Sequence, residues 1–545
     1  MALVCLSFAS LLPWVTATHA EPALVTLSIV GTSDLHGAAF PRGSSAGGLS
    51  LLAGYVHNLR AARALDGGAV LLIDSGDTFQ GDVESNLSEG ALVVDAYNAM
   101  GYTAEAIGNH DFDFGSVDSP LARQLPGDPR GALKALAARA RYPFLAANLI
   151  DEATGRLVEW PNVRPSVIVE AAGLKVGIIG VMTIDALRST LAANVQGLRI
   201  AALGPTIAAR ASTLRAAGAD VVIVAAHAGG RCERFDQPAD LSSCESESEI
   251  FRVAHSLPAG LVDVIAAGHT HAGLAQIVEG IGIIEPFSRG QTFGRVDVVV
   301  DRQTRRVARI QPFAPHEIAP GQYEGKPVAN DPAIERAMAP ALRRVRELQA
   351  TPLDVMIDTA IPRAGTAGSP LGAVFAAAMR EATGADVAAV NNADRGLRMD
   401  LPAGPLTLGR LYDVFPFDNR LARVTLTGAE LRAWIANEVQ QGRQRGLGLA
   451  GVVVRTDCKV DGLRIDLFRG GKAVGDDDRL VAVTIGGPTP SGGLASAAPV
   501  FSGGPIGNAP VVREIVEDWF RRRGASATSQ FDTDRGFVDC VAPRR

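Results

Sequence analysis

Five short polar motifs in the N-terminal part of the chain contain residue types that bind metal ions. The motifs read "SDLHG", "SGDTFQG", "GNHDFDFG", "AHAGG" and "GHTH", and they supply Asp34, His36, Asp77, Asn109, His110, His227, His269 and His271. Five of the nine histidines of the chain fall within these motifs, which scattered core histidines would not do. Ordinary positions in helices or loops are expected for His57, His255 and His316. Carboxylate, imidazole and amide donors without cysteine suit Zn, Mn, Fe, Co or Ni. The sequence therefore favours a metal site, although one such motif alone is more often a hydrogen-bonded structural group.

Each motif comes directly after an apolar, β-branched run, such as "ALVTLSIVG", "AVLLIDSGD" or "DVVIVAAHAGG". From residue 24 to about 310 these runs alternate with helical patterns, as expected of stacked α and β layers. Ligands in α/β sheets bind beyond the carboxyl ends of strands, where successive loops meet. Residues two apart in an extended strand point the same way, so Asp34 and His36 are expected to meet one cation. His269 and His271 are again two apart.

The length of the chain predicts more than one domain, because 545 residues exceed a single hydrophobic core. Between 331 and 351, apolar residues recur at helical spacing after an Asp cap and a first-turn proline. This helix is the expected connector. A second α/β region follows it and continues to the C-terminus.

Composition and the N-terminus limit the class of protein. A net charge of −6 without a Lys/Arg block argues against nucleic-acid binding. Residues 1–20 combine an apolar run with small residues and predict a secretory signal peptide, with a short N-terminal anchor as the alternative. No later segment is apolar for long enough to span a membrane. We therefore expect a periplasmic or secreted protein without a stable membrane anchor.

Cleavage after residue 20 would remove Cys5 and leave an even number of cysteines, which suits an oxidising compartment. Cys232 and Cys244 flank a polar stretch that needs a covalent tie to become ordered, so we expect a disulfide there. By elimination, Cys458 and Cys540 would form a second one. Unpaired surface thiols are the alternative.

Two groups of motifs resemble a known family. The five motifs, in this order, resemble those of the calcineurin-type metallophosphoesterases. The later segment "GPLTLGRLYDVFPFDNRL" resembles the C-terminal domain of the 5′-nucleotidase family, which includes periplasmic UDP-sugar hydrolases. The resemblance implies an α/β fold with a four-layer α/β/β/α metallophosphoesterase sandwich at 24–325. The connecting helix at 331–351 and a second α/β domain for substrate binding at 352–545 would follow.

The resemblance also implies two divalent metal ions, drawn from Zn, Mn, Co or Fe. One metal would be bound by Asp34, His36, Asp77 and His271. Asp77 would bridge to a second metal completed by Asn109, His227 and His269. In such a centre the two cations activate a water and polarise the phosphoryl oxygens.

His110 and Asp113 are the catalytic candidates that the resemblance implies. In the family the His after the Asn faces the substrate and pairs with a carboxylate three residues on, which here is Asp113. A protonated His110 would stabilise the charge of the transition state or protonate the leaving alkoxide. Asp111 ranks below Asp113, and Asp74 is expected to accept backbone hydrogen bonds instead of binding metal.

Substrate-binding residues are expected in the second region. The family stacks a Phe on the nucleobase and hydrogen-bonds the base with an Asn, here Phe417 and Asn419, although a buried core Phe is the plainer alternative. Arg398 is the best match to the family arginine that meets the substrate anion. Arg395 competes with it for this role, and Arg363 is a weaker candidate.

The expected reaction is hydrolysis of a nucleoside 5′-monophosphate to nucleoside and phosphate, with a small-molecule nucleotide as the only predicted partner. The alternatives are a UDP-sugar hydrolase, a 2′,3′-cyclic-nucleotide phosphodiesterase, or an inactive nucleotide-binding surface protein. The stretch "VAVTIGGPTPSGGLASAAPVF" lacks the second base-stacking aromatic of the family, and nothing argues that Phe501 replaces it. This departure predicts weak selectivity among bases. The sequence leaves the oligomeric state open.

Overall fold

The structure is a computed structural model that describes residues 23–41, 47–117, 127–365, 368–391, 396–416, 419, 421–459, 462–485 and 511–523. Several sequence predictions lie outside this part of the chain. They concern the leader at 1–20, Arg395, Phe417, Phe501 and the proposed partner of Cys458, Cys540.

The first sheet of the N-terminal half has seven strands in the order β16-β15-β1-β2-β3-β4-β7. Their bounds are Leu24–Thr32 (β1), Ala69–Asp74 (β2), Ala104–Ala106 (β3), Phe144–Leu145 (β4), Val163–Arg164 (β7), Thr292–Asp301 (β15) and Arg306–Glu317 (β16). β1, β2, β3 and β4 run parallel, so their carboxyl ends meet at one edge. The helices packed on its outer face are α1 (Leu49–Leu65), α3 (Ala91–Met100) and α4 (Gly131–Arg139).

The second sheet has six strands in the order β13-β14-β12-β11-β9-β8. Their bounds are Ser166–Ala171 (β8), Leu174–Met182 (β9), Val221–His227 (β11), Val264–Ala267 (β12), Gly273–Val278 (β13) and Ile281–Pro286 (β14). The outer face of this sheet packs against α5 (Leu203–Ala216) and α6 (Glu249–Ser256). A small sheet of β5 (Leu149–Asp151), β6 (Arg156–Leu157) and β10 (Leu198–Ile200) lies beside them.

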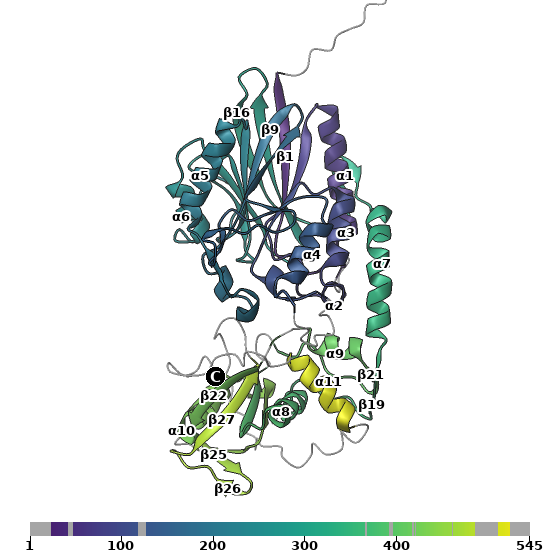
Figure 1. Ribbon diagram of the computed structural model, residues 1–545, viewed down its shortest axis with the longest axis vertical. Coiled ribbons are helices and arrows are strands. Elements are labelled where there is room, and N and C mark those ends of the chain that lie inside the picture. Colours follow the sequence, from purple (N-terminus) through teal and green to yellow (C-terminus); the bar gives the residue numbers. More distant parts are fainter. Residues whose placement is uncertain are drawn as a thin grey trace, which may run out of the picture.

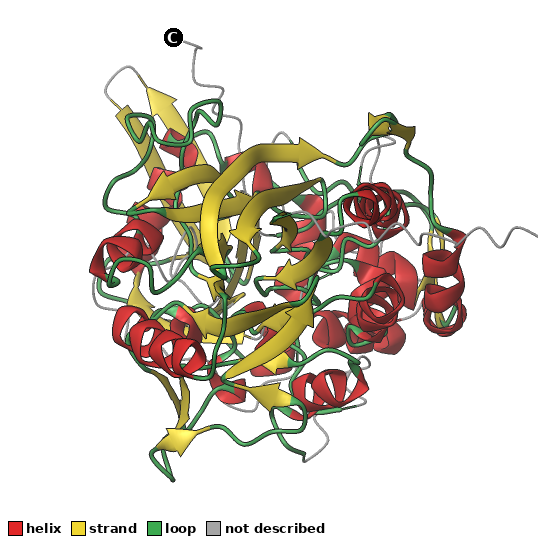
Figure 2. Cartoon of the chain, turned by 90° about the horizontal axis from the view of Figure 1, so that it is seen from above, coloured by secondary structure: helices red, strands yellow, loops and turns green. Residues whose placement is uncertain are grey.

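The inner faces of the two sheets form one buried apolar layer. Leu27, Ile29 and Ile73 of the first sheet pack against Ile178 and Ile223 of the second, and all are essentially inaccessible to solvent. The continuous apolar runs in the sequence follow from this burial, because these strands are covered on both faces. The result is a four-layer α/β/β/α sandwich, visible from above in Figure 2, which confirms the predicted fold class.

Helix α7 (Pro332–Gln349) runs along the side of the molecule between its two halves (Figure 1). Asp331 caps its first turn by accepting a hydrogen bond from the Ala333 N–H at 2.8 Å. Ile334 packs into the core of the N-terminal half, whereas Val345 packs into the core of the C-terminal half. The helix therefore fixes one half against the other through apolar contacts at both ends.

The C-terminal half is built on a four-stranded sheet in the order β22-β27-β20-β23. Its strands are Val387–Asn391 (β20), Leu421–Thr427 (β22), Leu447–Ala450 (β23) and Arg479–Ile485 (β27). One face packs against α8 (Pro370–Thr383), α9 (Leu408–Val414) and α11 (Val512–Arg523), and the other against α10 (Gly428–Gln440). The remaining strands are β19 (Pro352–Ile357), β21 (Gly404–Thr407), β24 (Val453–Lys459), β25 (Gly462–Arg469) and β26 (Lys472–Ala473).

The short helix α2 (Val83–Leu87) joins the two halves near the carboxyl edge of the first sheet. Leu87 is buried in the core of the C-terminal half. The Asn86 side-chain amide donates a hydrogen bond to the Pro416 carbonyl at 2.8 Å. Pro416 of the second half is thereby held next to the loops that follow β2.

Two expectations about single residues can be compared with the structure. Cys232 and Cys244 form a disulfide, as predicted. His316, expected in a helix or loop, lies instead in β16, where its ring packs against Tyr55, Phe293 and Tyr323. The local pattern misled because β16 is a long antiparallel edge strand with mixed polar and apolar residues. Among the described residues, no helix is both long and apolar enough to cross a membrane.

Candidate functional site

Asp34, His36 and His271 form a first donor group at the carboxyl edge of the sheets. Asp34 and His36 follow β1, and His271 follows β12. The Nε2 atoms of His36 and His271 lie 3.0 Å apart, and His271 Nε2 lies 3.3 Å from Asp34 Oδ1. One ligand atom from each residue falls within 4.8 Å of the others, which is a spacing that one metal ion can bridge.

Asp77, His227 and His269 form a second donor group beside the first. His227 Nε2 lies 3.3 Å from Asp77 Oδ2 and 3.2 Å from His269 Nδ1. Asn109 joins this group, because its Oδ1 lies 2.9 Å from the same His227 nitrogen. The structure thus brings together all seven residues predicted as ligands.

The Asp77 carboxylate lies between the two groups. Its Oδ2 atom is 3.3 Å from His227 Nε2 in the second group and 4.0 Å from His36 Nε2 in the first. Its other oxygen, Oδ1, accepts the His110 backbone N–H at 2.7 Å. The carboxylate is buried, so it is held in this position by fixed neighbours and not by solvent.

Backbone carbonyls orient the candidate ligands. His36 Nδ1–H donates to the Gln80 carbonyl at 3.0 Å, and His227 Nδ1–H donates to the Ser75 carbonyl at 2.8 Å. Because a carbonyl can only accept, both rings carry a proton on Nδ1 and turn the Nε2 edge toward the donor groups. The Asn109 amide donates to the Ser189 carbonyl at 3.0 Å, which directs its oxygen the same way.

Five of the seven candidate ligands have a left-handed backbone, although none is glycine. Asp34 and His36 each have φ of 49°, Asp77 57°, His271 55° and His269 80°. Such backbones cost about 1–3 kcal/mol each and persist only where the surrounding structure determines them. All five residues lie in the loops of the candidate site. The placement of their side chains, and not the backbone preference of each residue, therefore determines the conformation of these turns.

Burial and mutual charge set the protonation of the cluster. Burial lowers the pKa of His36 to about 3, and burial with the charge of His227 lowers the pKa of His269 to about 4. Both rings are therefore neutral at pH 7. Burial would lower the pKa of His227 as well, but the carboxylates of Asp77 and Asp34 raise it to about 10. Burial would raise the pKa of Asp77, yet the nearby imidazoles of His227 and His110 hold it well below its ordinary value.

His110 and Asp113 form a hydrogen-bonded pair at the side of the two groups. His110 Nδ1 lies 2.6 Å from Asp113 Oδ2, and the His110 ring packs edge-on against His36 at 5.4 Å between centroids. Burial would lower the pKa of His110, but the carboxylates of Asp113 and Asp77 raise it to about 9. Thr190 donates its hydroxyl to the second Asp113 oxygen at 2.7 Å.

Sequence reasoning missed two supporting residues, Thr190 and Glu285, because they lie far from the motifs along the chain. Thr190 orients Asp113. Glu285, buried at the end of β14, accepts hydrogen bonds from the Thr270 hydroxyl at 2.7 Å and the Gly230 N–H at 3.1 Å. Thr270 stands between the two ligands of "GHTH", so Glu285 fixes that loop. A charged residue directly after an apolar run, in "IGIIEP", was the available signal.

Asp111, ranked low as a catalytic residue, has a positioning role in the structure. Its carboxylate accepts backbone N–H bonds from Gly108 at 2.7 Å, Thr78 at 2.9 Å and Asp77 at 3.2 Å. It thereby ties the loop of Asp77 to the loop of Asn109. Asp74 accepts the Gly76 N–H at 2.8 Å, in line with the structural role expected for it.

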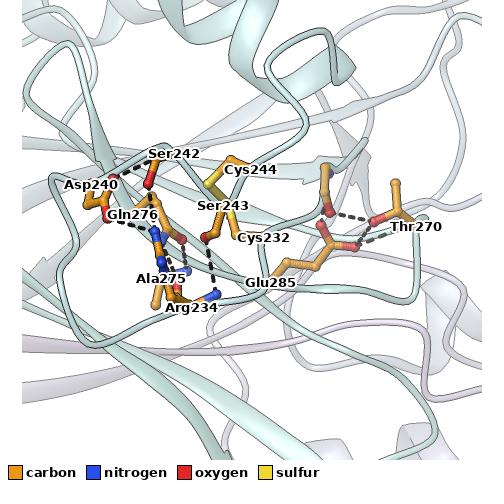
Figure 3. Close-up of a disulfide and its surroundings, with 11 residues drawn as sticks. Cys232, Arg234, Asp240, Ser242, Ser243, Cys244, Thr270, Ala275, Gln276 and Glu285 are labelled. Atoms are coloured by element: carbon orange, nitrogen blue, oxygen red, sulfur yellow. Dashed lines mark hydrogen bonds and ion pairs between the residues drawn. A yellow bond between two sulfur atoms is a disulfide. The ribbon is translucent and has the colours of Figure 1, made fainter.

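The disulfide loop supports the strand that follows His271 (Figure 3). The Cys232 N–H donates to the Gly273 carbonyl at 3.2 Å, and the Gln276 side chain donates to the Arg234 carbonyl at 2.8 Å. The covalent link between Cys232 and Cys244 thus holds a polar loop against β13.

In the C-terminal half, the structure places Arg363 next to Arg398. The Arg363 guanidinium donates to the Arg398 carbonyl at 2.7 Å, and the Arg398 N–H donates to the Val414 carbonyl at 2.8 Å. The Asn419 carbonyl accepts the Val512 N–H at 2.9 Å, which anchors this residue to the start of α11. Both arginines are exposed.

The family model described as "5′-nucleotidase, C-terminal domain" matches residues 349–487. The C-terminal half of the chain therefore carries a 5′-nucleotidase C-terminal domain. The resemblance drawn from the motifs is therefore confirmed. The matched range covers β19 to β27, the half of the molecule that carries Arg363, Arg398 and Asn419.

Known proteins match most of the chain. It is 23% identical over 442 residues to Protein UshA of Yersinia enterocolitica, covering 75% of this chain and 76% of that protein. It is 26% identical over 379 residues to Endonuclease YhcR of Bacillus subtilis, covering 68% of this chain but only 28% of that longer protein. The crystal structure of a 5′-nucleotidase precursor from Thermus thermophilus matches with a TM-score of 0.59 at 21% identity, covering 92% of this chain and 97% of that one. The structural match shows that the fold is shared over both halves.

Proposed function

We propose that this protein is a metal-dependent phosphohydrolase that cleaves nucleoside 5′-monophosphates to nucleoside and phosphate. The match to the 5′-nucleotidase C-terminal domain and the solved 5′-nucleotidase precursor of the same fold support the substrate class. The observation that carries the proposal is the Asp77 carboxylate between two donor groups, with the His110–Asp113 pair beside them.

The donor chemistry fits two divalent cations. The first donor group offers carboxylate and imidazole, and the second adds the Asn109 amide oxygen, a mixture that Zn, Mn, Co or Fe accepts. The hydrogen bonds that fix the tautomers of His36 and His227 are those expected of metal ligands. Two cations bound there would polarise the phosphoryl oxygens and lower the pKa of an attacking water.

His110 would protonate the leaving group. In the reaction a water oxygen bonds to phosphorus while the bond from phosphorus to the nucleoside O5′ breaks. Asp113 accepts from His110 Nδ1, so His110 Nε2 is left to give its proton to O5′. The proton lost by the water passes to solvent, from which His110 is reprotonated. Thr190 keeps Asp113 in place during this transfer.

The C-terminal half would bind the rest of the nucleotide. Phe417 and Asn419 are proposed to contact the base, and Arg363 and Arg398 the anionic part of the substrate. The hydrogen bond from Asn86 to the Pro416 carbonyl supports this assignment, because it holds the residue before Phe417 against the loops of the N-terminal half. A periplasmic or secreted location is proposed from the leader-like residues 1–20 and is supported by the disulfide.

Metal analysis of two variants tests the proposal. Asp77→Ala removes the carboxylate between the donor groups and should lower bound metal from two ions toward one or none, with loss of AMP hydrolysis. His110→Ala should keep both metals while losing most of the rate. If His110→Ala lost metal as fully as Asp77→Ala, the division between binding and catalytic residues would be wrong.

A further inference from the structure

The segment after β14 is tied to the loops that carry candidate ligands. The Phe287 N–H donates to the Ala272 carbonyl at 2.9 Å, next to His271, and the Arg289 N–H donates to the Asp34 carbonyl at 2.8 Å. Phe287 and Arg289 both have left-handed backbones, with φ of 59° and 62°. The backbone of Arg289 is thus fixed beside the first donor group.

The Arg289 side chain reaches Asp82, in the loop that also carries Asp77. Its Nη1 atom is 3.4 Å from Asp82 Oδ1, and the Asp82 N–H donates to the His36 carbonyl at 3.0 Å. About a third of the Arg289 side chain is accessible, at 34%, whereas Asp82 is 7% exposed. Buried Asp82 therefore orients one edge of the guanidinium, while the side chain keeps contact with solvent beside the site.

This arginine also faces the second half of the molecule. Asp82 is the residue before α2, and Asn86 within α2 donates to the Pro416 carbonyl. Asp82 and α2, next to Arg289, therefore connect the loop of His36 in the first donor group to Pro416 of the second half. A nucleotide with its phosphate at the donor groups and its base near Phe417 would pass this position.

We propose that Arg289 is a substrate-binding residue whose guanidinium binds the phosphate group of the nucleotide. This inference rests on the proposed function and adds to it an anion contact from the N-terminal half. A guanidinium carries five N–H donors in a planar fork that matches phosphate oxygens, so it can bind a phosphate while Asp82 holds one edge.

Kinetics of Arg289→Ala and Arg289→Lys test the proposal. For Arg289→Ala, KM for AMP and the inhibition constant of inorganic phosphate should both rise about 10- to 100-fold, as expected from losing hydrogen bonds to a charged group. Metal content and melting temperature should stay at the wild-type values. Arg289→Lys should recover part of the phosphate affinity, because it restores the charge without the fork.

Arg305→Ala is the matched control. Arg305 also has a left-handed backbone, with φ of 54°, and pairs with the Asp220 carboxylate at 2.6 Å. It lies in the turn between β15 and β16, and Asp301 at that turn pairs with Leu24 at the start of β1. Asp34 follows the other end of β1, so Arg305 is remote from the site. This variant should match the wild type in KM and in phosphate inhibition.

Two results would overturn the proposal. Unchanged KM and unchanged phosphate inhibition in Arg289→Ala would show that the guanidinium does not touch the substrate. Loss of metal, or a fall in kcat at constant KM, would assign Arg289 to loop support only. If the wild type released phosphate from no nucleotide, the proposed function would fail, and calorimetric titration of both proteins with inorganic phosphate would still decide the role of Arg289.

Discussion

Replacing Gly108 with Ala should displace the Asp77 carboxylate and so damage the candidate centre without removing any ligand. A Cβ at position 108 would lie 2.3 Å from both the backbone nitrogen and Oδ1 of Asp77. Gly108 has no left-handed backbone, so the expected effect comes from this close approach alone. Asp77 is buried, and its backbone cannot yield without moving the loop.

The size of the effect follows from these distances. Ordinary contacts begin at 3.4 Å, so the two groups must separate by roughly 3.4 − 2.3 ≈ 1.1 Å. Asp77 Oδ2 now lies 3.3 Å from His227 Nε2 and 4.0 Å from His36 Nε2, and a shift of this size upsets both spacings. Overpacking of this kind costs about 1–3 kcal/mol. A misplacement of about 1 Å in a catalytic group lowers the rate on the order of 100-fold.

Three measurements on Gly108→Ala check this reasoning. AMP hydrolysis should fall on the order of 100-fold in kcat/KM, bound metal should drop, and the melting temperature should decrease. Gly321→Ala is the matched control, because its backbone is ordinary and the nearest atom to its added Cβ is a carbonyl oxygen 4.0 Å away. That variant should keep wild-type metal and activity. Wild-type metal content and rate in Gly108→Ala would refute the claim that Asp77 must stay where it is.

Further predictions follow from the hydrogen bonds and covalent links around the site. Asp113→Asn should keep both metals but lower kcat about 10²- to 10⁴-fold, as expected of impaired proton transfer, and a wild-type kcat would remove Asp113 from the mechanism. Replacing Cys232 and Cys244 with Ser should lower the free energy of unfolding by about 3 kcal/mol in the chain-entropy model, and unchanged denaturant unfolding would contradict that. AMP, GMP, UMP and CMP should differ little in kcat/KM, with affinity dependent on Phe417. Strong preference for one base that survives Phe417→Ala would place base recognition elsewhere.

The clustering of the candidate ligands could be predicted from the sequence because each of them lies at or just after the end of a strand. Parallel strands end at one edge, so motifs as distant as those of Asp34 and His271 meet there once the sheets form. The connecting helix could be predicted equally well, because its Asp331 cap and the spacing of its apolar residues are local signals. The layered fold follows from the same alternation of apolar runs and helices.

Individual contacts that loops make over the edge of the sheets could not be predicted. Thr190 reaches Asp113, and Glu285 reaches the Thr270 loop, only because of how loops are folded over the edge of the sheets. The same holds for Asp82 and Arg289, which are 207 positions apart in the chain. Local pattern carries no information on such pairs, because their geometry is set by tertiary packing. The prediction for His316 was wrong for a different reason, because this residue lies in an edge strand, β16, whose sequence lacks a clear alternating pattern.

Phosphate release by metal-stripped protein, before and after reloading with single divalent cations, tests the central claim most directly. The protein stripped of metal should not hydrolyse AMP, and reloading with Zn, Mn, Co or Fe should restore release of one phosphate per nucleoside formed. Across a panel that includes UDP-sugars and 2′,3′-cyclic nucleotides, nucleoside 5′-monophosphates should be cleaved with the highest kcat/KM. Undiminished hydrolysis by the stripped protein, or no hydrolysis of any monophosphate by protein that has rebound metal, would contradict the account.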